Sequence, residues 1–156
     1  MIVFSLSRLE KENIRLEGTE PAEFIALAEG DAFRVTSGVS YTLDVSRVSG
    51  GALVSGEVET EISGECGHCL APVSRKVATG EFQFFVETPP GMEVCDISEE
   101  VRTEITLALP MNLLCREDCR GLCPECGADL NVTKCSCKPK SARGSGVWDA
   151  LDDLKL

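Results

Sequence analysis

The sequence has few aromatic residues, a single histidine and a shortage of basic side chains. Only 5% of its 156 residues are aromatic, which leaves little for stacking against nucleic-acid bases. Lys and Arg number 15 against 26 Asp and Glu, so the formal net charge is −11. This charge disfavours attraction to a phosphate backbone and suits a basic protein partner better, although it could also serve solubility alone.

The sequence also lacks a long apolar run. No stretch approaches the roughly 20 residues that span a membrane. Residues 1–9 lack the basic start and continuous apolar centre of a signal peptide. We therefore expect no membrane contact and a cytoplasmic location, or the equivalent space inside an organelle after removal of a transit peptide. The chain of 156 residues is long enough for one domain, and its 43% hydrophobic residues are enough for a core.

Motifs of catalysis are missing as well. The sequence contains no Gly-rich phosphate loop and no convincing Ser/His/Asp arrangement. The run Cys66-Gly67-His68-Cys69 has the spacing of a dithiol redox centre, but such a centre follows a strand and begins a helix. Here more strand pattern follows, and the alternation of strands and helices of that fold is absent. The sequence therefore predicts that the protein is not an enzyme.

Alternation of apolar and polar residues with a period of two predicts a mostly antiparallel β structure. The expected strands cover residues 1–9, 13–17, 32–36, 39–48, 52–62 and 72–87, the last broken near Thr79-Gly80. Capping residues and helical spacing predict helices over residues 19–30, 98–109 and 147–156.

The expected fold class is α+β. It consists of a meandering antiparallel sheet or small barrel, two or three short helices and a C-terminal cysteine-rich zinc-binding segment. We expect a single β-rich domain over residues 1–137 that includes the zinc-binding segment 111–137. A flexible linker over 138–146 and a short terminal helix over 147–156 complete the prediction.

In contrast to these absences, the sequence contains nine cysteines. An odd count and an expected reducing compartment argue against a disulfide framework, so metal binding is the better explanation. Cys123 and Cys126, which are separated by two residues, can bind one ion from a single turn, and Gly127 can adopt the positive φ that the turn needs. Four thiolates make a closed tetrahedral zinc site. The first predicted site consists of Cys123, Cys126, Cys135 and Cys137.

A second site is predicted from the remaining close pairs. It would consist of Cys66, Cys69, Cys115 and Cys119, and its ion would connect the sheet to the end of the helix. The alternative is a single ion, with these cysteines free or serving as alternative ligands. Cys95 has no partner at metal spacing, and His68 is expected to be a solvent-facing turn residue.

Four motifs follow one another along the chain: C-G-H-C-L-A-P from Cys66, L-A-L-P from Leu107, C-R-E-D-C-R-G-L-C-P-E-C-G-A-D-L-N from Cys115, and the later C-S-C. Together they resemble the bacterial YceD family, also known as DUF177 or large ribosomal RNA subunit accumulation proteins. The resemblance covers roughly residue 50 to the end of the chain. It implies a cytoplasmic, non-enzymatic factor for accumulation of large-subunit (23S) ribosomal RNA.

The leading hypothesis is therefore a zinc-stabilised adaptor in large-subunit biogenesis. Its acidic body would meet a basic ribosomal protein or an assembly intermediate of the large subunit. One alternative is a direct RNA-binding zinc module, and another is a thiol/zinc redox sensor that ejects metal when Cys66 and Cys69 are oxidised. The residues that could contact ribosomal RNA are Arg116, Arg120, Lys134, Lys138 and Lys140.

Overall fold

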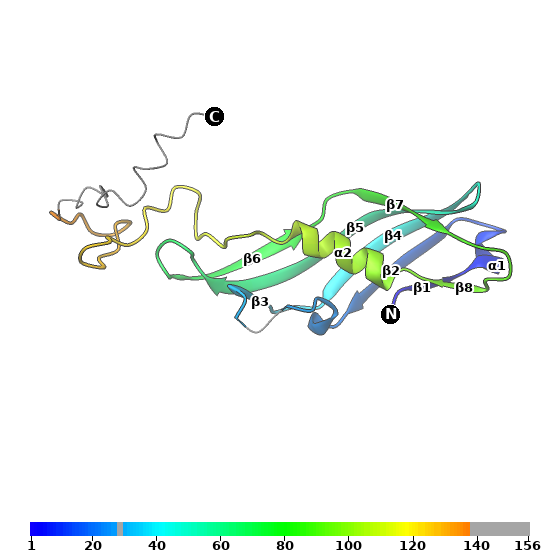
Figure 1. Cartoon of the computed structure of the whole chain (residues 1–156), viewed down its shortest axis with the longest axis horizontal. Coiled ribbons are helices and arrows are strands. Elements are labelled where there is room, and N and C mark those ends of the chain that lie inside the picture. Colours follow the sequence, from blue (N-terminus) through cyan, green and yellow to red (C-terminus); the bar gives the residue numbers. More distant parts are fainter. Residues whose placement is uncertain (28–29, 138–156) are drawn as a thin grey trace, which may run out of the picture.

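The computed structural model describes residues 1–27 and 30–137. The molecule is elongated, with β-sheet along most of its length and the cysteine-rich segment at one end (Figure 1). The strands are β1 (Val3–Ser5), β2 (Ile14–Glu20), β3 (Phe33–Val35), β4 (Val39–Val48), β5 (Gly51–Glu65), β6 (Pro72–Ala78), β7 (Phe82–Glu87) and β8 (Val94–Asp96). The helices are α1 (Leu6–Leu9), the 3-10 turn η1 (Ala22–Phe24) and α2 (Ser98–Ala108).

Strand β5 is the axis of the main sheet because it is long enough to take two partners along each edge. β4 pairs with its first part and β3 with its second part on one edge, while β7 and β6 do the same on the other. β2 adds to β4, and β1 pairs with β8 in a separate two-stranded sheet. All of these pairs are antiparallel, so the mostly antiparallel sheet predicted from the sequence is confirmed.

The alternative of a small barrel is wrong. Within the described residues, the strand pairing runs from β2 through β4 to β5 and ends at β3, β6 and β7, so the sheet has open edges. A barrel would need one of these edge strands to pair back onto another.

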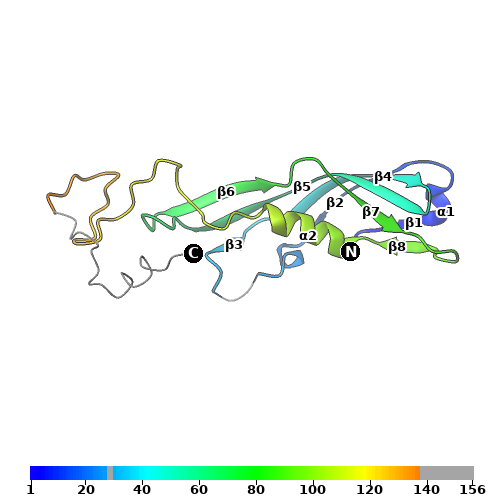
Figure 2. The same cartoon turned by 45° about the horizontal axis from the view of Figure 1, so that its top comes forward.

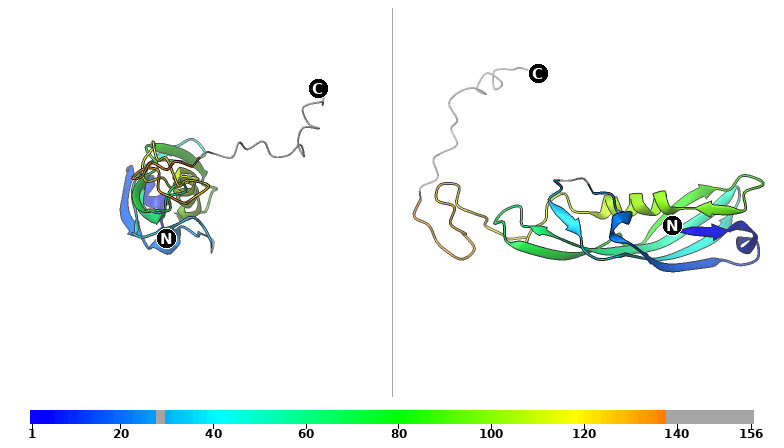
Figure 3. Two further views of the ribbon diagram at one scale, coloured as in Figure 1. Left: turned by 90° about the vertical axis from the view of Figure 1, so that its left-hand side faces the viewer. Right: turned by 90° about the horizontal axis from the view of Figure 1, so that it is seen from below.

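The core lies on one face of this sheet. Along β5 the side chains of Val54, Val58 and Ile62 are fully buried, as the period-two pattern predicts. Helix α2 covers this face and contributes Val101 and Ile105 to the same core. Figures 2 and 3 show α2 lying along one side of the sheet. Burying each such side chain stabilises the fold by about 1.5–3 kcal/mol, so the helix and the sheet stabilise each other.

Helix α2 forms where the sequence predicts it. Asp96 accepts hydrogen bonds from the backbone N–H and the hydroxyl of Ser98, at 2.9 and 2.6 Å, and the same hydroxyl accepts the Ile2 backbone N–H at 2.8 Å. The start of the helix is thus tied to the N-terminal strand. The backbone becomes extended at Leu109, because the residue before Pro110 disfavours the helical conformation.

Two other expectations are wrong. The helix predicted from residue 19 is absent from the described part of that stretch, because Thr19 and Glu20 pair with β4 as the end of β2, and only the 3-10 turn η1 follows. The single strand expected over residues 1–9 ends at Ser5 and turns into α1. The linker predicted at 138–146 and the helix predicted at 147–156 lie outside the described residues.

None of the helices within the described ranges is both long enough and apolar enough to cross a bilayer.

Candidate metal centres

A tight turn joins β5 to β6 and carries the first cysteine pair. The backbone N–H of Cys66 donates to the carbonyl of Ala71 at 2.8 Å, and the N–H of Leu70 donates to the carbonyl of Cys66 at 2.9 Å. The N–H of His68 lies 3.5 Å from the Cys66 sulfur. Leu70 has a φ of 60°, the left-handed conformation that this turn imposes after its second cysteine.

The chain after α2 brings a second cysteine pair to this turn. The backbone N–H of Gly67 donates to the carbonyl of Leu113 at 2.8 Å, and Leu113 is itself buried. As a result, the Cys66 and Cys119 sulfurs lie 3.8 Å apart, and the Cys69 and Cys115 sulfurs 3.7 Å apart. We call Cys66, Cys69, Cys115 and Cys119 the Cys66 cluster.

A second turn of the same form lies further along the chain. The N–H of Cys123 donates to the carbonyl of Ala128 at 2.8 Å, and the N–H of Gly127 donates to the carbonyl of Cys123 at 2.8 Å. Gly127 has a φ of 71°. Cys135 and Cys137 meet this turn, and we call Cys123, Cys126, Cys135 and Cys137 the Cys123 cluster.

Both clusters fit a tetrahedral metal ion. In each, the four sulfur atoms lie within 4.8 Å of one another. Four thiolates bound at about 2.3 Å, as in structural metal sites, would be separated by about 3.8 Å. The two close separations in the Cys66 cluster, 3.7 and 3.8 Å, match this value and far exceed the roughly 2 Å of a disulfide. The clusters could therefore each hold a metal ion, while ligation itself stays a prediction.

Backbone N–H groups favour one thiolate in each cluster. The pKa of Cys66 is lowered to about 6, mainly by a backbone hydrogen bond from Cys115. The pKa of Cys123 is lowered to about 7, mainly by the backbone N–H of Cys126, with a contribution from Glu125. Amide dipoles aimed at sulfur thus prepare one ligand of each cluster as an anion.

Once these thiolates form, their neighbours resist ionisation. Hydrogen bonding to the Cys119 thiol raises the pKa of Cys115 to about 12, and the Cys126 thiol does the same to Cys137. A cluster of four thiols therefore retains protons at neutral pH unless a cation replaces them.

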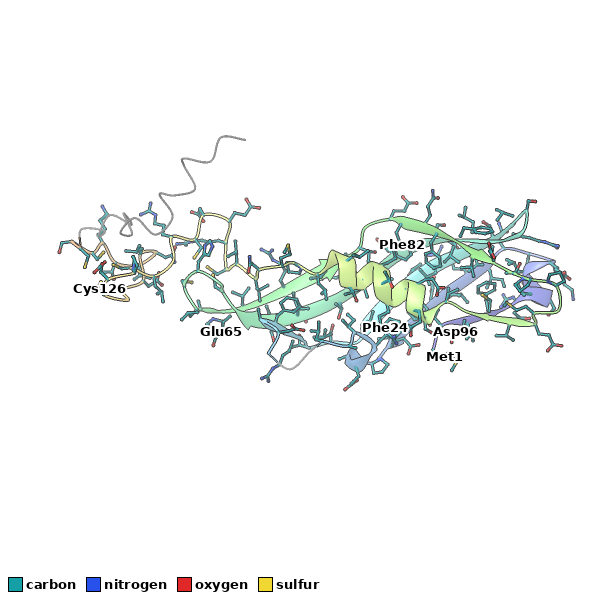
Figure 4. All side chains as sticks on the ribbon, in the orientation of Figure 1. Met1, Phe24, Glu65, Phe82, Asp96 and Cys126 are labelled. Carbon is teal, nitrogen blue, oxygen red and sulfur yellow. The ribbon has the colours of Figure 1, made fainter. Side chains whose placement is uncertain are left out.

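The two clusters differ in exposure and in place. Figure 4 shows Glu65, which ends β5, at the end of the sheet next to the cysteine segment, with Cys126 at the far tip. Three cysteines of the Cys66 cluster are buried, but only Cys123 is buried in the other. The Cys66 cluster thus joins the sheet to the segment, and the Cys123 cluster stands apart from the sheet.

The remaining predicted residues have clear positions. His68 is exposed in its turn, with Nδ1 3.3 Å from the Cys119 carbonyl oxygen. Cys95 lies on β8 in the main core, where burial raises its pKa. Cys66 and Cys69 close a β-hairpin instead of starting a helix, so the setting of a thioredoxin-type dithiol is absent.

The basic residues considered for RNA contact divide into three groups. Arg116 Nε lies 3.4 Å from Asp118 Oδ1, and Arg116 Nη2 donates to Asn131 Oδ1 at 2.7 Å. Arg120 and Lys134 are exposed. Lys138 and Lys140 lie outside the described residues. Asn131, which no motif in the sequence singles out, also contacts Cys119, with its Nδ2 3.4 Å from the sulfur.

The fold and the two clusters define a β-rich protein with paired four-cysteine centres. Comparison with known proteins shows which family its C-terminal part resembles. Residues 85–155 match the family model described as "Large ribosomal RNA subunit accumulation protein YceD", which confirms the recognition made from the sequence. The C-terminal part of this chain is therefore similar to the YceD family.

This chain is also similar to curated proteins of bacteria and plants. An uncharacterised protein of Mycobacterium tuberculosis is 36% identical over 122 residues, covering 69% of this chain and 56% of that protein. A Zea mays protein named large ribosomal RNA subunit accumulation protein YCED homolog 1, chloroplastic, is 40% identical over 57 residues, 36% of this chain and 20% of the plant protein. The chain thus spans little more than half of the mycobacterial relative. No solved structure matches this chain.

Proposed function

We propose that this protein is a non-enzymatic factor for large ribosomal subunit biogenesis that supports accumulation of 23S ribosomal RNA in the cytoplasm. The observation that carries the proposal is the family match over residues 85–155, which includes six of the eight clustered cysteines. The family's description names accumulation of an RNA and no reaction. Closed four-thiolate centres support a non-enzymatic role, since they leave no open position for a substrate or water.

The metal of both clusters in this proposal is zinc. Four thiolates in a tetrahedral arrangement are typical of structural zinc. Its contribution is to fold the segment after α2 and to attach it to the β5–β6 hairpin. The protein then acts as an adaptor, with the metal holding one surface in a fixed position relative to the sheet.

The face of the sheet that α2 does not cover supports the proposal of a basic partner. Because side chains alternate along a strand, Glu57, Glu59 and Glu61 share the face of β5 that α2 does not cover. Lys76, on the neighbouring strand, lies with its Nζ 2.7 Å from Glu59. Its pKa is raised first by this hydrogen bond and then by the charges of all three glutamates, so the row favours a cation. A basic ribosomal protein or an assembly intermediate of the large subunit fits this face.

Depletion of the protein tests the main proposal. We expect the ratio of 23S to 16S ribosomal RNA to fall on depletion and to recover with the wild-type gene, but not with a Cys66→Ser/Cys126→Ser variant. An unchanged ratio on depletion would overturn the function, whereas full rescue by the double variant would overturn the role of the metal.

Charge reversal tests the partner surface. A Glu57→Lys/Glu61→Lys variant should lose co-purification with large-subunit proteins. A Glu93→Lys/Glu100→Lys variant changes net charge equally at exposed positions away from this face and should keep it. Equal loss in both variants would show that only overall charge matters and would contradict a defined surface.

Two alternatives remain as distinct outcomes of simple measurements. Direct RNA binding predicts an affinity that falls steeply with salt and weakens in Arg120→Ala and Lys134→Ala variants. The contacts of Arg116 with Asp118 and Asn131 leave that arginine less suited to phosphate.

Redox sensing predicts metal release on mild oxidation of the Cys66 and Cys69 pair, which thiol titration with and without a chelator would detect.

A further inference from the structure

The side-chain amide of Asn131 contacts Cys119 of the Cys66 cluster and uses all of its hydrogen-bonding positions. Its Nδ2 lies 3.4 Å from the Cys119 sulfur and also donates to Asp129 Oδ1 at 2.8 Å. Its Oδ1 accepts from the backbone N–H of Arg120 at 2.9 Å and from Arg116 Nη2 at 2.7 Å. A carboxamide offers two donors and two acceptor positions, and all four are occupied here, which also fixes which way the amide faces.

The contacts of this side chain fall on the loop of the Cys66 cluster. Arg116 and Arg120 flank the loop that ends in Cys119, so the amide spans it while donating to the Cys119 sulfur. An N–H group that donates to a ligand atom fixes the orientation of that ligand. Asn131 therefore supports the Cys66 cluster, although it is not one of its ligands.

The position of Asn131 is set by the other cluster. Asp129 accepts the backbone N–H of Asn131 at 2.8 Å and pairs with Leu122 as a β-bridge beside the Cys123 turn. The N–H of Leu130 donates to the carbonyl of Gly121 at 2.9 Å. The small hairpin that carries Asn131 is thus the one whose tip holds Cys123 and Cys126.

We propose that Asn131 is a positioning residue that couples metal binding in the two clusters. Metal at the Cys123 cluster fixes the hairpin, the hairpin places the Asn131 amide, and the amide holds the Cys119 sulfur of the Cys66 cluster in position. Coupling of this kind is reciprocal, so metal at the Cys66 cluster also strengthens binding at the Cys123 cluster. The inference rests on the metal-binding part of the proposed function and is independent of ribosomal RNA.

Cadmium in place of zinc allows each cluster to be followed separately. The full chain loaded with ¹¹³Cd should give one NMR resonance for each cluster, and a Cys126→Ser variant assigns them. Titration with a chelator then gives the affinity of each cluster. We expect Asn131→Ala to shift the resonance of the Cys66 cluster and to weaken its binding about tenfold.

Two further variants separate the hydrogen bond from packing. Asn131→Asp keeps the acceptor oxygen for Arg120 but loses the donor to Cys119, so it should weaken the Cys66 cluster at least as much as Asn131→Ala. Asn112→Ala removes an exposed amide from the approach to Cys115 and should change neither cluster.

The coupling itself appears in a double-mutant cycle. Cys126→Ser should weaken metal binding at the Cys66 cluster when Asn131 is present. In the Asn131→Ala variant, Cys126→Ser should have no added effect on the affinity of that cluster. Two cadmium resonances with unchanged affinities in both Asn131 variants would overturn the inference alone. Additive effects of Cys126→Ser and Asn131→Ala would also overturn it. Absence of any bound cadmium would instead overturn the metal-binding proposal beneath it.

Discussion

Leu70 and Gly127 occupy the same position in two turns of the same form. Each follows the second cysteine of a C-x-x-C pair, and each donates its backbone N–H to the carbonyl of the first cysteine, at 2.9 and 2.8 Å. Both have left-handed backbone, with φ of 60° and 71°. Glycine adopts this conformation at little cost, whereas a leucine is strained there by about 1–2 kcal/mol.

This relationship predicts opposite effects of two substitutions. Leu70→Gly removes the strain from a side chain that is 59% exposed, so the variant should keep its metal and gain up to about 1 kcal/mol in stability. Gly127→Leu introduces the strain and should cost about 1–2 kcal/mol. Thermal unfolding of metal-loaded protein measures both. Equal loss of stability in the two variants would contradict the shared geometry.

A second prediction concerns pH. The pKa values of Cys69 and Cys115 are raised, that of Cys115 to about 12, so both thiols hold protons at neutral pH. A metal ion must displace these protons, and each displaced proton makes the affinity fall about tenfold per unit decrease in pH. We expect the affinity of the Cys66 cluster to fall at least about a hundredfold between pH 8 and pH 7.

Below the pKa of Cys66, about 6, a further proton competes and the slope should steepen. Metal-competition titrations in a Cys126→Ser variant, at a series of pH values, give this slope. An affinity independent of pH would show that the thiols are already ionised without metal.

A third prediction follows from the unequal burial of the clusters. Cys126 and Cys137 are exposed, whereas Cys66, Cys69 and Cys119 are buried. A chelator or oxidant should therefore reach the Cys123 cluster first, and metal should leave in two phases. In a Cys126→Ser variant the fast phase should vanish. Loss of the slow phase in that variant would show that the assignment of the phases is reversed.

A fourth prediction separates the sheet core from the metal centres. Ile105 on α2 is fully buried against the sheet, so Ile105→Ala should destabilise the fold by about 2–5 kcal/mol. Denaturant unfolding measures the loss. At temperatures where the variant is folded, its metal content should equal that of the wild type, and the exposed Leu107→Ala provides a matched helix control.

Much of the fold follows from local patterns in the sequence. Alternation along β5 reports which side chains face the core, and it correctly assigns Val54, Val58 and Ile62 to the buried face. Polar and acidic residues at the start of α2, with Pro110 after it, are sufficient to place that helix. The C-x-x-C spacings mark both turns because that geometry depends only on residues close in sequence.

The parts that could not be predicted depend on distant contacts. Period-two patterns do not say which strands pair, so the arrangement of two partners along each edge of β5 was not foreseen. Thr19-Glu20-Pro21 can begin a helix or end a strand, and pairing with β4 decides for the strand. Asn131 looks like any polar residue after a turn, and only the fold brings its amide to Cys119. The D-L-N run after the second turn was the available signal.

The ratio of zinc to protein tests most directly whether this chain forms two separate closed metal centres. Elemental analysis of the purified full chain should give two ions per molecule for the wild type. Cys66→Ser and Cys126→Ser should each lower the ratio to one, or further where coupling through Asn131 empties part of the second cluster. One ion or none in the wild type, or a ratio of two that persists in Cys66→Ser, would contradict the account.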